Sequence, residues 1–91
     1  MYYNNDTIIY LNGKIVKASE GKIDLYSETL HYGYGVFEGI RSYKTMDEET
    51  KIFKADEHFD RLKNSAHALN LPYPWKRAEL IDATYQVLRL N

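Results

Sequence analysis

The sequence predicts an α+β fold, in which an antiparallel sheet carries two helices packed on one face. Three observations support this prediction. An Asn-Gly pair separates two β-branched runs near the start of the chain, apolar and polar residues alternate in runs before residue 55, and apolar residues then recur at spacings of three and four. Because 91 residues form one domain at most, the predicted domain spans residues 1–91.

Composition excludes several classes of protein. The apolar fraction of 44% is ordinary for a globular domain, and the net charge of −1 argues against a nucleic-acid binder. The absence of cysteine excludes disulfides, thiol catalysis and thiolate metal sites. The first residues, MYYNNDT, lack the features of a secretory signal, and no apolar run approaches the roughly 20 residues of a membrane span. We therefore expect a cytoplasmic protein without membrane contact.

The first elements are short strands. Residues 7–11 and 14–17 flank Asn12-Gly13, which predicts a tight hairpin because both turn residues tolerate positive φ. Apolar residues at 23 and 25 alternate with Asp24 and suggest another short strand. A turn of helix is expected near residues 28–30, before a bend that Gly33 and Gly35 bracket.

Residues 36–43 read as a strand whose side chains alternate between two faces. One face carries Val36, Glu38, Ile40 and Ser42, and the other carries Phe37, Gly39, Arg41 and Tyr43. A polar hairpin tip at residues 46–50 leads to a return strand at 51–54.

Two helices follow. The first begins near Asp56 and buries Phe59, Leu62, Ala66 and Leu69, which lie on one helical face. It ends at Asn70, Pro72 and Pro74. The second helix begins near Lys76, has an apolar side formed by Leu80, Thr84, Val87 and Leu88, and reaches Asn91 with no residue that closes it. We therefore expect a longer protein to continue beyond this point.

Residues 31–43, HYGYGVFEGIRSY, are the most informative stretch. An aromatic ring, a missing side chain at Gly39 and a cation alternate on one face, which suits a ligand that is partly apolar and partly anionic. A bulge or a tight strand crossing would also explain Gly39. Glu38 lies among apolar neighbours and needs a partner, so a structural ion pair is the favoured interpretation.

Other patterns carry less information. The spacing of Gly33, Gly35 and Gly39 departs from the dinucleotide fingerprint, and the histidines show no metal-ligand spacing, since His58 and His67 point to opposite sides of one helix. His31 beside Tyr32 is either an acid–base pair or hydrogen-bonded scaffold. Arg61 is either a guanidinium that holds a phosphate or a surface residue paired with Glu57.

Two segments together indicate a family. HYGYGVFEGIRSY, followed by IFKADEHFDRLKNSAHAL, closely resembles the N-terminal domain of the class IV (fold type IV) pyridoxal-phosphate aminotransferases, and most of all the branched-chain amino-acid aminotransferases. The preceding YLNGKIVKASEGKIDLYSETL fits the same family. The resemblance extends over residues 8–91 and depends on the combination of "HYG-x-x-VFEGIR" with "EH-x-x-RL".

The resemblance implies roles for individual residues. Arg61 would bind the phosphate of pyridoxal 5'-phosphate, and Phe37 and Gly39 would line the substrate pocket. Tyr32 would contribute to the pocket of a neighbouring subunit, and Arg41 would lie near the site. The lysine that forms a Schiff base with the cofactor lies in the family's larger C-terminal domain, and no lysine of this chain matches it, so no catalytic residue is expected here.

The resemblance also implies an activity. The parent enzyme would transfer an amino group between leucine, isoleucine or valine and 2-oxoglutarate, and would be a dimer or higher homo-oligomer. This chain would be an inactive N-terminal fragment of that two-domain enzyme. Alternatives are the same domain of a D-amino-acid aminotransferase or an aminodeoxychorismate lyase, or a standalone binding or oligomerisation module without catalysis.

Overall fold

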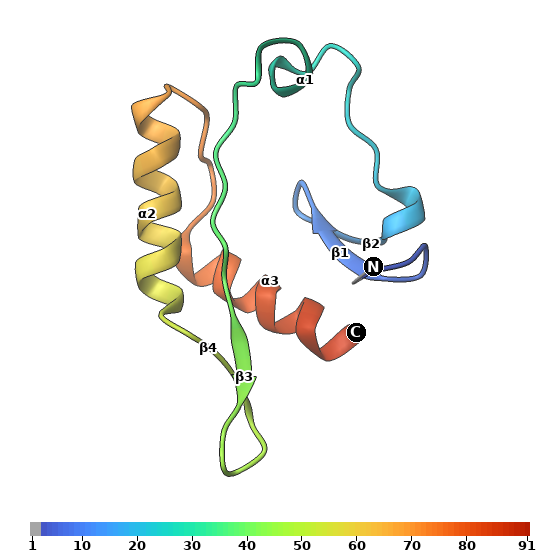
Figure 1. The fold of residues 1–91 in the computed structure, drawn as a ribbon, viewed down its shortest axis with the longest axis vertical. Helices are drawn as coiled ribbons and strands as arrows, with labels where there is room; N and C mark the ends of the chain where they lie inside the picture. The colour runs from blue at the N-terminus through green and yellow to red at the C-terminus, as the bar shows by residue number, and fades with distance from the viewer. Residues whose placement is uncertain (1–2) are drawn as a thin grey trace.

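The computed structural model describes residues 3–91, and the first two residues of the predicted domain lie outside this range. Figure 1 shows a small hairpin, a long irregular connection, a second hairpin and two helices, in this order along the chain. The mixture of antiparallel strands and helices confirms the predicted α+β class. The elements are β1 (Ile8–Leu11), β2 (Lys14–Lys17), the 3-10 turn η1 (Ala18–Glu20), α1 (Glu28–Tyr32), β3 (Ser42–Lys44), β4 (Thr50–Ile52), α2 (Ala55–Ala68) and α3 (Arg77–Leu90).

The first hairpin forms as predicted. β1 and β2 pair antiparallel, with Ile9 opposite Val16 and Tyr10 opposite Ile15. Both turn residues have positive φ, 51° at Asn12 and 87° at Gly13. This conformation matches the twist of the flanking strands, which is why Asn-Gly is favoured at such turns.

The short strand predicted around Ile23 and Leu25 is wrong, because this segment has no strand in the structure. The reason is local hydrogen bonding at Asp24. Its side chain accepts the N–H of Tyr26 at 2.8 Å, and its carbonyl accepts the N–H of Ser27 at 3.0 Å. Such Asx turns compete with extended structure. The helical turn predicted next is confirmed, and α1 continues to Tyr32, just before Gly33.

The strand predicted over residues 36–43 is only partly present, because β3 and β4 form a short ladder from Ser42 onwards. The predicted alternation of faces is nevertheless confirmed for residues 36–41: Val36, Glu38 and Ile40 are half-buried, whereas the intervening residues are exposed. This extended segment does not pair with another strand. It lies beside α2, and Glu38 contacts His58 and Arg61 of that helix. The return strand also ends early, at Ile52, because Lys54 adopts a left-handed conformation at the start of α2.

The expectation of one sheet carrying both helices is wrong, because the strands form two separate two-stranded sheets. α3 packs on β1, and α2 packs on α3. An outer edge of β1 is occupied by a side chain instead of another strand. The Asn91 side chain accepts the N–H of Ile8 and donates to its carbonyl, each at 2.8 Å. Asn91 also donates to the carbonyl of Val87, so a capping residue is present where none was expected.

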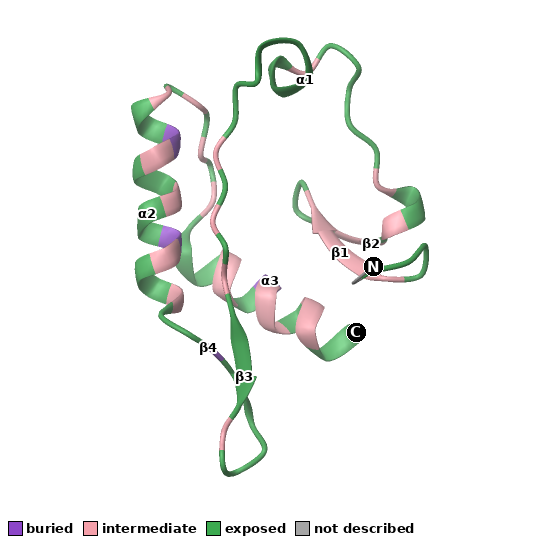
Figure 2. Ribbon diagram, viewed as in Figure 1, coloured by how far each residue is buried: buried purple, intermediate pink, exposed green. Residues whose placement is uncertain are grey.

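The core lies between α2, α3 and β4. Its buried residues are Ile52, Phe59, Ala66 and Ala83 (Figure 2). The predicted face of α2 is therefore confirmed, whereas Ala83 was not among the residues expected on the apolar side of α3. Arg77 binds Asp60 and Asp56 across the two helices. Within the described range, no helix combines the length and apolar character that a membrane span requires.

Candidate functional site

The centre of the candidate site is the carboxylate of Glu38. Its side chain is only 9% exposed, and both of its oxygens accept hydrogen bonds. The Nε of Arg61 donates to Oε2 at 2.9 Å, its Nη2 donates to Oε1 at 2.7 Å, and Nδ1 of His58 lies 2.8 Å from Oε1. The structural ion pair favoured for Glu38 is confirmed. The alternative pairing of Arg61 with Glu57 is wrong.

Two elements bring this triad together. His58 and Arg61 are three residues apart on α2, so they project from neighbouring positions of one helical face. Glu38 belongs to the half-buried face of the extended segment beside that helix. Sequence reasoning considered His58 only as a metal ligand and missed this contact. The three-residue spacing from Arg61, together with a carboxylate in need of a partner, was the available signal.

The electrostatics of the triad are dominated by the Arg61 hydrogen bonds. These bonds and, after them, the hydrogen bond from His58 lower the pKa of Glu38 from 4.5 to about 2. In turn, Glu38 raises the pKa of Arg61. Because a carboxylate only accepts hydrogen bonds, Nδ1 of His58 carries the proton in this contact. The carboxylate is therefore ionised at any physiological pH and faces donors on both oxygens.

The outer end of Arg61 is open. Its side chain is 67% exposed, and its Nη1 makes no hydrogen bond to any of residues 3–91. A guanidinium whose inner edge is held by a carboxylate can still present its outer donors to a second anion. Phosphate oxygens match this planar donor geometry. The geometry of Arg61 therefore fits the phosphate of a cofactor.

The opposite face of the extended segment is open to solvent. Phe37 is 88% exposed, and the side chain of Arg41 forms no ion pair within the described part of the chain. A methyl group placed on Gly39 would meet no heavy atom of residues 3–91 within 4 Å. Neither a tight strand crossing nor a close backbone contact inside this chain therefore explains Gly39. Phe37, Gly39 and Arg41 form an exposed surface on one face of the segment. A ligand in contact with both this surface and Arg61 would have to extend past the segment to its other face.

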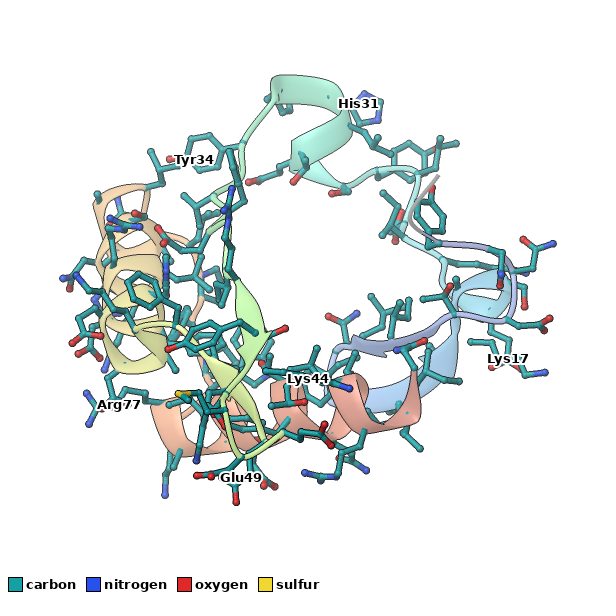
Figure 3. The ribbon with its side chains drawn as sticks, turned by 60° about the horizontal axis from the view of Figure 1, so that its bottom comes forward. Lys17, His31, Tyr34, Lys44, Glu49 and Arg77 are labelled. Carbon is teal, nitrogen blue, oxygen red and sulfur yellow. The ribbon has the colours of Figure 1, made fainter. Side chains whose placement is uncertain are left out.

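Tyr32 stands apart from these residues. It belongs to α1, which Figure 1 shows at the far end of the irregular connection from β3, and its side chain is 81% exposed. Figure 3 shows the same separation, with His31 of α1 far from Lys44 of β3. Nε2 of His31 is hydrogen-bonded to the carbonyl of Leu25 at 2.9 Å, in keeping with the scaffold interpretation. The structure thus places Phe37, Gly39 and Arg41 on the exposed face of one extended segment, and Arg61 on α2 beside the opposite, half-buried face. Tyr32 lies apart from all of them on α1.

The fold and the motif residues define a class of protein. Residues 35–91 match the profile of the family described as Amino-transferase class IV, and the chain belongs to this family. It is 40% identical to the branched-chain-amino-acid aminotransferase of Pseudomonas aeruginosa over 88 residues, which cover 97% of this chain and 28% of that protein.

Solved structures agree with this assignment. The Escherichia coli branched-chain amino acid aminotransferase superposes with a TM-score of 0.87 at 36% identity, covering 97% of this chain and 28% of that one. A second branched-chain amino acid aminotransferase, from the source abbreviated T.th., was solved with N-(5'-phosphopyridoxyl)-L-glutamate. It gives a TM-score of 0.85 at 40% identity over 92% of this chain and 28% of that one. The same protein has also been solved with 4-methylvaleric acid. The chain therefore spans little more than a quarter of the length of these relatives.

Proposed function

We propose that this chain is the N-terminal domain of a two-domain branched-chain amino-acid aminotransferase, and that Arg61 holds the phosphate of pyridoxal 5'-phosphate. The proposal depends on the hydrogen bonding of the Arg61 guanidinium. Its Nε and Nη2 are bound by Glu38, while its Nη1 faces solvent. Membership of the family and a relative that binds a phosphopyridoxyl compound support the same assignment.

When bound, the cofactor supplies an electron-withdrawing ring that makes the transfer of an amino group feasible. The residues of this chain bind and orient. Arg61 binds the phosphate, and the exposed ring of Phe37 covers an apolar substrate side chain. Gly39 leaves room beside that ring. Arg41 contributes positive charge near the acid group of the substrate.

The remaining parts of the reaction belong to the whole enzyme. The lysine that bonds to the cofactor is expected in the C-terminal domain of such an enzyme, so the exchange of an amino group between leucine, isoleucine or valine and 2-oxoglutarate needs both domains. We also propose that Tyr32, which is exposed on a helix distant from Arg61, reaches the pocket of a neighbouring subunit. The enzyme would then act as a homo-oligomer, and we place it in the cytoplasm.

Two measurements test the domain assignment. The 91-residue chain, supplied with pyridoxal 5'-phosphate, leucine and 2-oxoglutarate, is expected to form no glutamate. Robust turnover by the chain alone would contradict the assignment. The mass of the protein purified from its native source is expected to match a protein of which this chain is about 28% in length, as in the relatives.

Ligand binding tests the role of Arg61. Pyridoxamine 5'-phosphate and pyridoxamine differ only in the phosphate, and neither has an aldehyde that could react with surface lysines. The chain is expected to prefer the phosphorylated compound, and Arg61→Ala is expected to reduce this preference about tenfold, as for loss of a charge-assisted contact. Arg77→Ala is the matched control, since Arg77 binds Asp56 and Asp60 instead. An equal preference in the wild-type chain and Arg61→Ala would contradict the assignment.

A further inference from the structure

We infer that Glu38 is a positioning residue for the phosphate site, and that His58 supports it. Glu38 would not touch the ligand; it would hold the guanidinium of Arg61 in the orientation that binds phosphate. This inference rests on the proposed role of Arg61. It adds the two residues that hold the exposed guanidinium of Arg61 in an orientation suited to phosphate.

The two hydrogen bonds from Arg61 fix its plane. Donors at Nε and Nη2 reach the two different oxygens of Glu38, at 2.9 Å and 2.7 Å. This side-on, bidentate arrangement sets both the position and the rotation of the guanidinium. An arginine that is 67% exposed would otherwise sample many rotamers, and a ligand would have to order it on binding. Because Glu38 holds the guanidinium, Arg61 is already ordered before a ligand binds.

His58 in turn fixes the carboxylate. Its Nδ1 donates to Oε1 of Glu38 at 2.8 Å, and its side chain is only 15% exposed. The next residue along α2, Phe59, is part of the buried core. The orientation of Arg61 is therefore set by two side chains that are themselves held against a packed helix. A functional group supported in this way keeps its geometry far better than one on a free loop.

Glu38 has a second, opposing effect on phosphate. Its negative charge partly cancels the charge of Arg61, which weakens the attraction of Arg61 for an anion. The low pKa of Glu38 keeps this charge in place at neutral pH. Positioning and charge cancellation therefore predict opposite outcomes for Glu38→Gln, which removes the charge but keeps the size. If positioning dominates, the substitution weakens phosphate binding, and if cancellation dominates, it strengthens it.

The experiment follows the carbon-13 signal of Arg61 Cζ in the 91-residue chain during titration with inorganic phosphate, and then with pyridoxamine 5'-phosphate or pyridoxamine. The Arg61 signal of the wild-type chain is expected to shift saturably with both phosphate compounds. Glu38→Gln is expected to raise both dissociation constants about tenfold and to leave pyridoxamine binding unchanged. Asp60→Asn is the matched control: it removes one carboxylate from the same helix, but that carboxylate binds Arg77.

The outcomes separate this inference from the proposed function. If the wild-type Arg61 signal does not move, Arg61 is not a phosphate anchor and the proposed function loses its support. If it moves, and Glu38→Gln binds phosphate equally well or more tightly, only the positioning role is overturned. A parallel loss of pyridoxamine binding would also overturn it, because a general structural defect affects both compounds.

A second pair of variants keeps the test decisive if Glu38→Gln does not fold. His58→Phe removes the donor to Glu38, whereas His58→Asn retains an N–H close to the place of Nδ1. Phosphate affinity is expected to fall in the first and to recover in the second. Equal affinities in the two variants would overturn the role of His58 and, with it, the inferred support of Arg61.

Discussion

Two regions of this molecule use apolar side chains in opposite ways. The packed unit, made of β3, β4, α2 and α3, encloses Ile52, Phe59, Ala66 and Ala83. The open arm, residues 21–37, exposes its large apolar side chains to solvent: Ile23, Leu25, Tyr26, Leu30, Tyr32 and Phe37. The first region has a buried core, although Tyr43, Phe53 and Leu90 remain exposed on it, whereas the second region buries none of its large apolar side chains. Exposed apolar surface of this kind is typical of sites that another molecule or domain covers.

The proposed functional residues divide between the same two regions. Arg61, the proposed phosphate anchor, belongs to the packed unit, whereas Phe37 and Tyr32, two of the proposed substrate residues, belong to the open arm. Gly39 and Arg41 lie on the extended segment between the two regions. The guanidinium of Arg61 is thus held in place within this chain, whereas the apolar side chains of the arm make no such packed contacts within residues 3–91. Loss of a large buried side chain in the packed unit should therefore cost much more stability than loss of an exposed apolar side chain in the arm.

The largest effect is expected for a matched pair of phenylalanines. Phe59→Ala should lower the free energy of unfolding by about 3–5 kcal/mol, because Phe59 is only 7% exposed and its loss leaves a cavity. This is a large part of the roughly 5–10 kcal/mol expected for a domain of this size. Phe37→Ala should change it by less than about 0.5 kcal/mol, since Phe37 is exposed. Urea unfolding of both variants measures the difference, and similar losses would abolish the distinction between the two regions.

A smaller effect is expected for a pair of glycines. Gly33 closes α1 with φ of 62°, a left-handed conformation that costs an alanine about 1 kcal/mol. Gly39 has open space around its α-carbon, so Gly39→Ala should leave the free energy of unfolding unchanged. Gly39→Ala should instead weaken the binding of an apolar amino-acid substrate by the complete enzyme. A destabilised Gly39→Ala chain would mean that Gly39 has a structural role in the extended segment beside α2.

The sequence predicted the parts of the fold that local chemistry determines. Asn12-Gly13 dictates its turn, and the spacing of Phe59 and Ala66 dictates which face of α2 is buried. It did not predict the separation of the two sheets, or that Asn91, far along the chain, binds the edge of β1. It also missed the turn at Asp24, where a side chain outcompetes the alternation of Ile23 and Leu25.

Prediction of the candidate site has a similar limit. The need of Glu38 for a partner followed from its apolar neighbours, but the choice of partner is a matter of tertiary structure. Glu57, one helical turn away, was the local candidate for the partner of Arg61. Arg61 pairs with Glu38 instead, because the extended segment lies against α2. Periodicity identifies which face a residue occupies, and only the packing of the elements decides which residue it meets there.

The contact between Glu38 and Arg61 joins the packed unit to the segment that continues into the open arm, and its pH dependence gives the smallest effect. The pKa of Glu38 is 4.5 in an unfolded chain and about 2 in the folded one. Between these values the unfolded state binds the proton first, so this contribution to stability is complete above about pH 4.5 and is lost as the pH falls through 2. The effect is small because water screens the exposed Arg61.

Urea unfolding at several pH values between 7 and 2 measures this contribution as the difference between the wild-type chain and Glu38→Gln. We expect that difference to stay constant above about pH 5 and to shrink as the pH approaches 2. Arg61→Ala should lose most of the same pH dependence, because the Arg61 hydrogen bonds are the largest cause of the lowered pKa of Glu38. If the difference in unfolding free energy between the two chains did not change with pH, the charge of Glu38 would not contribute to stability. Glu38 would then hold the extended segment against α2 by packing and neutral hydrogen bonds.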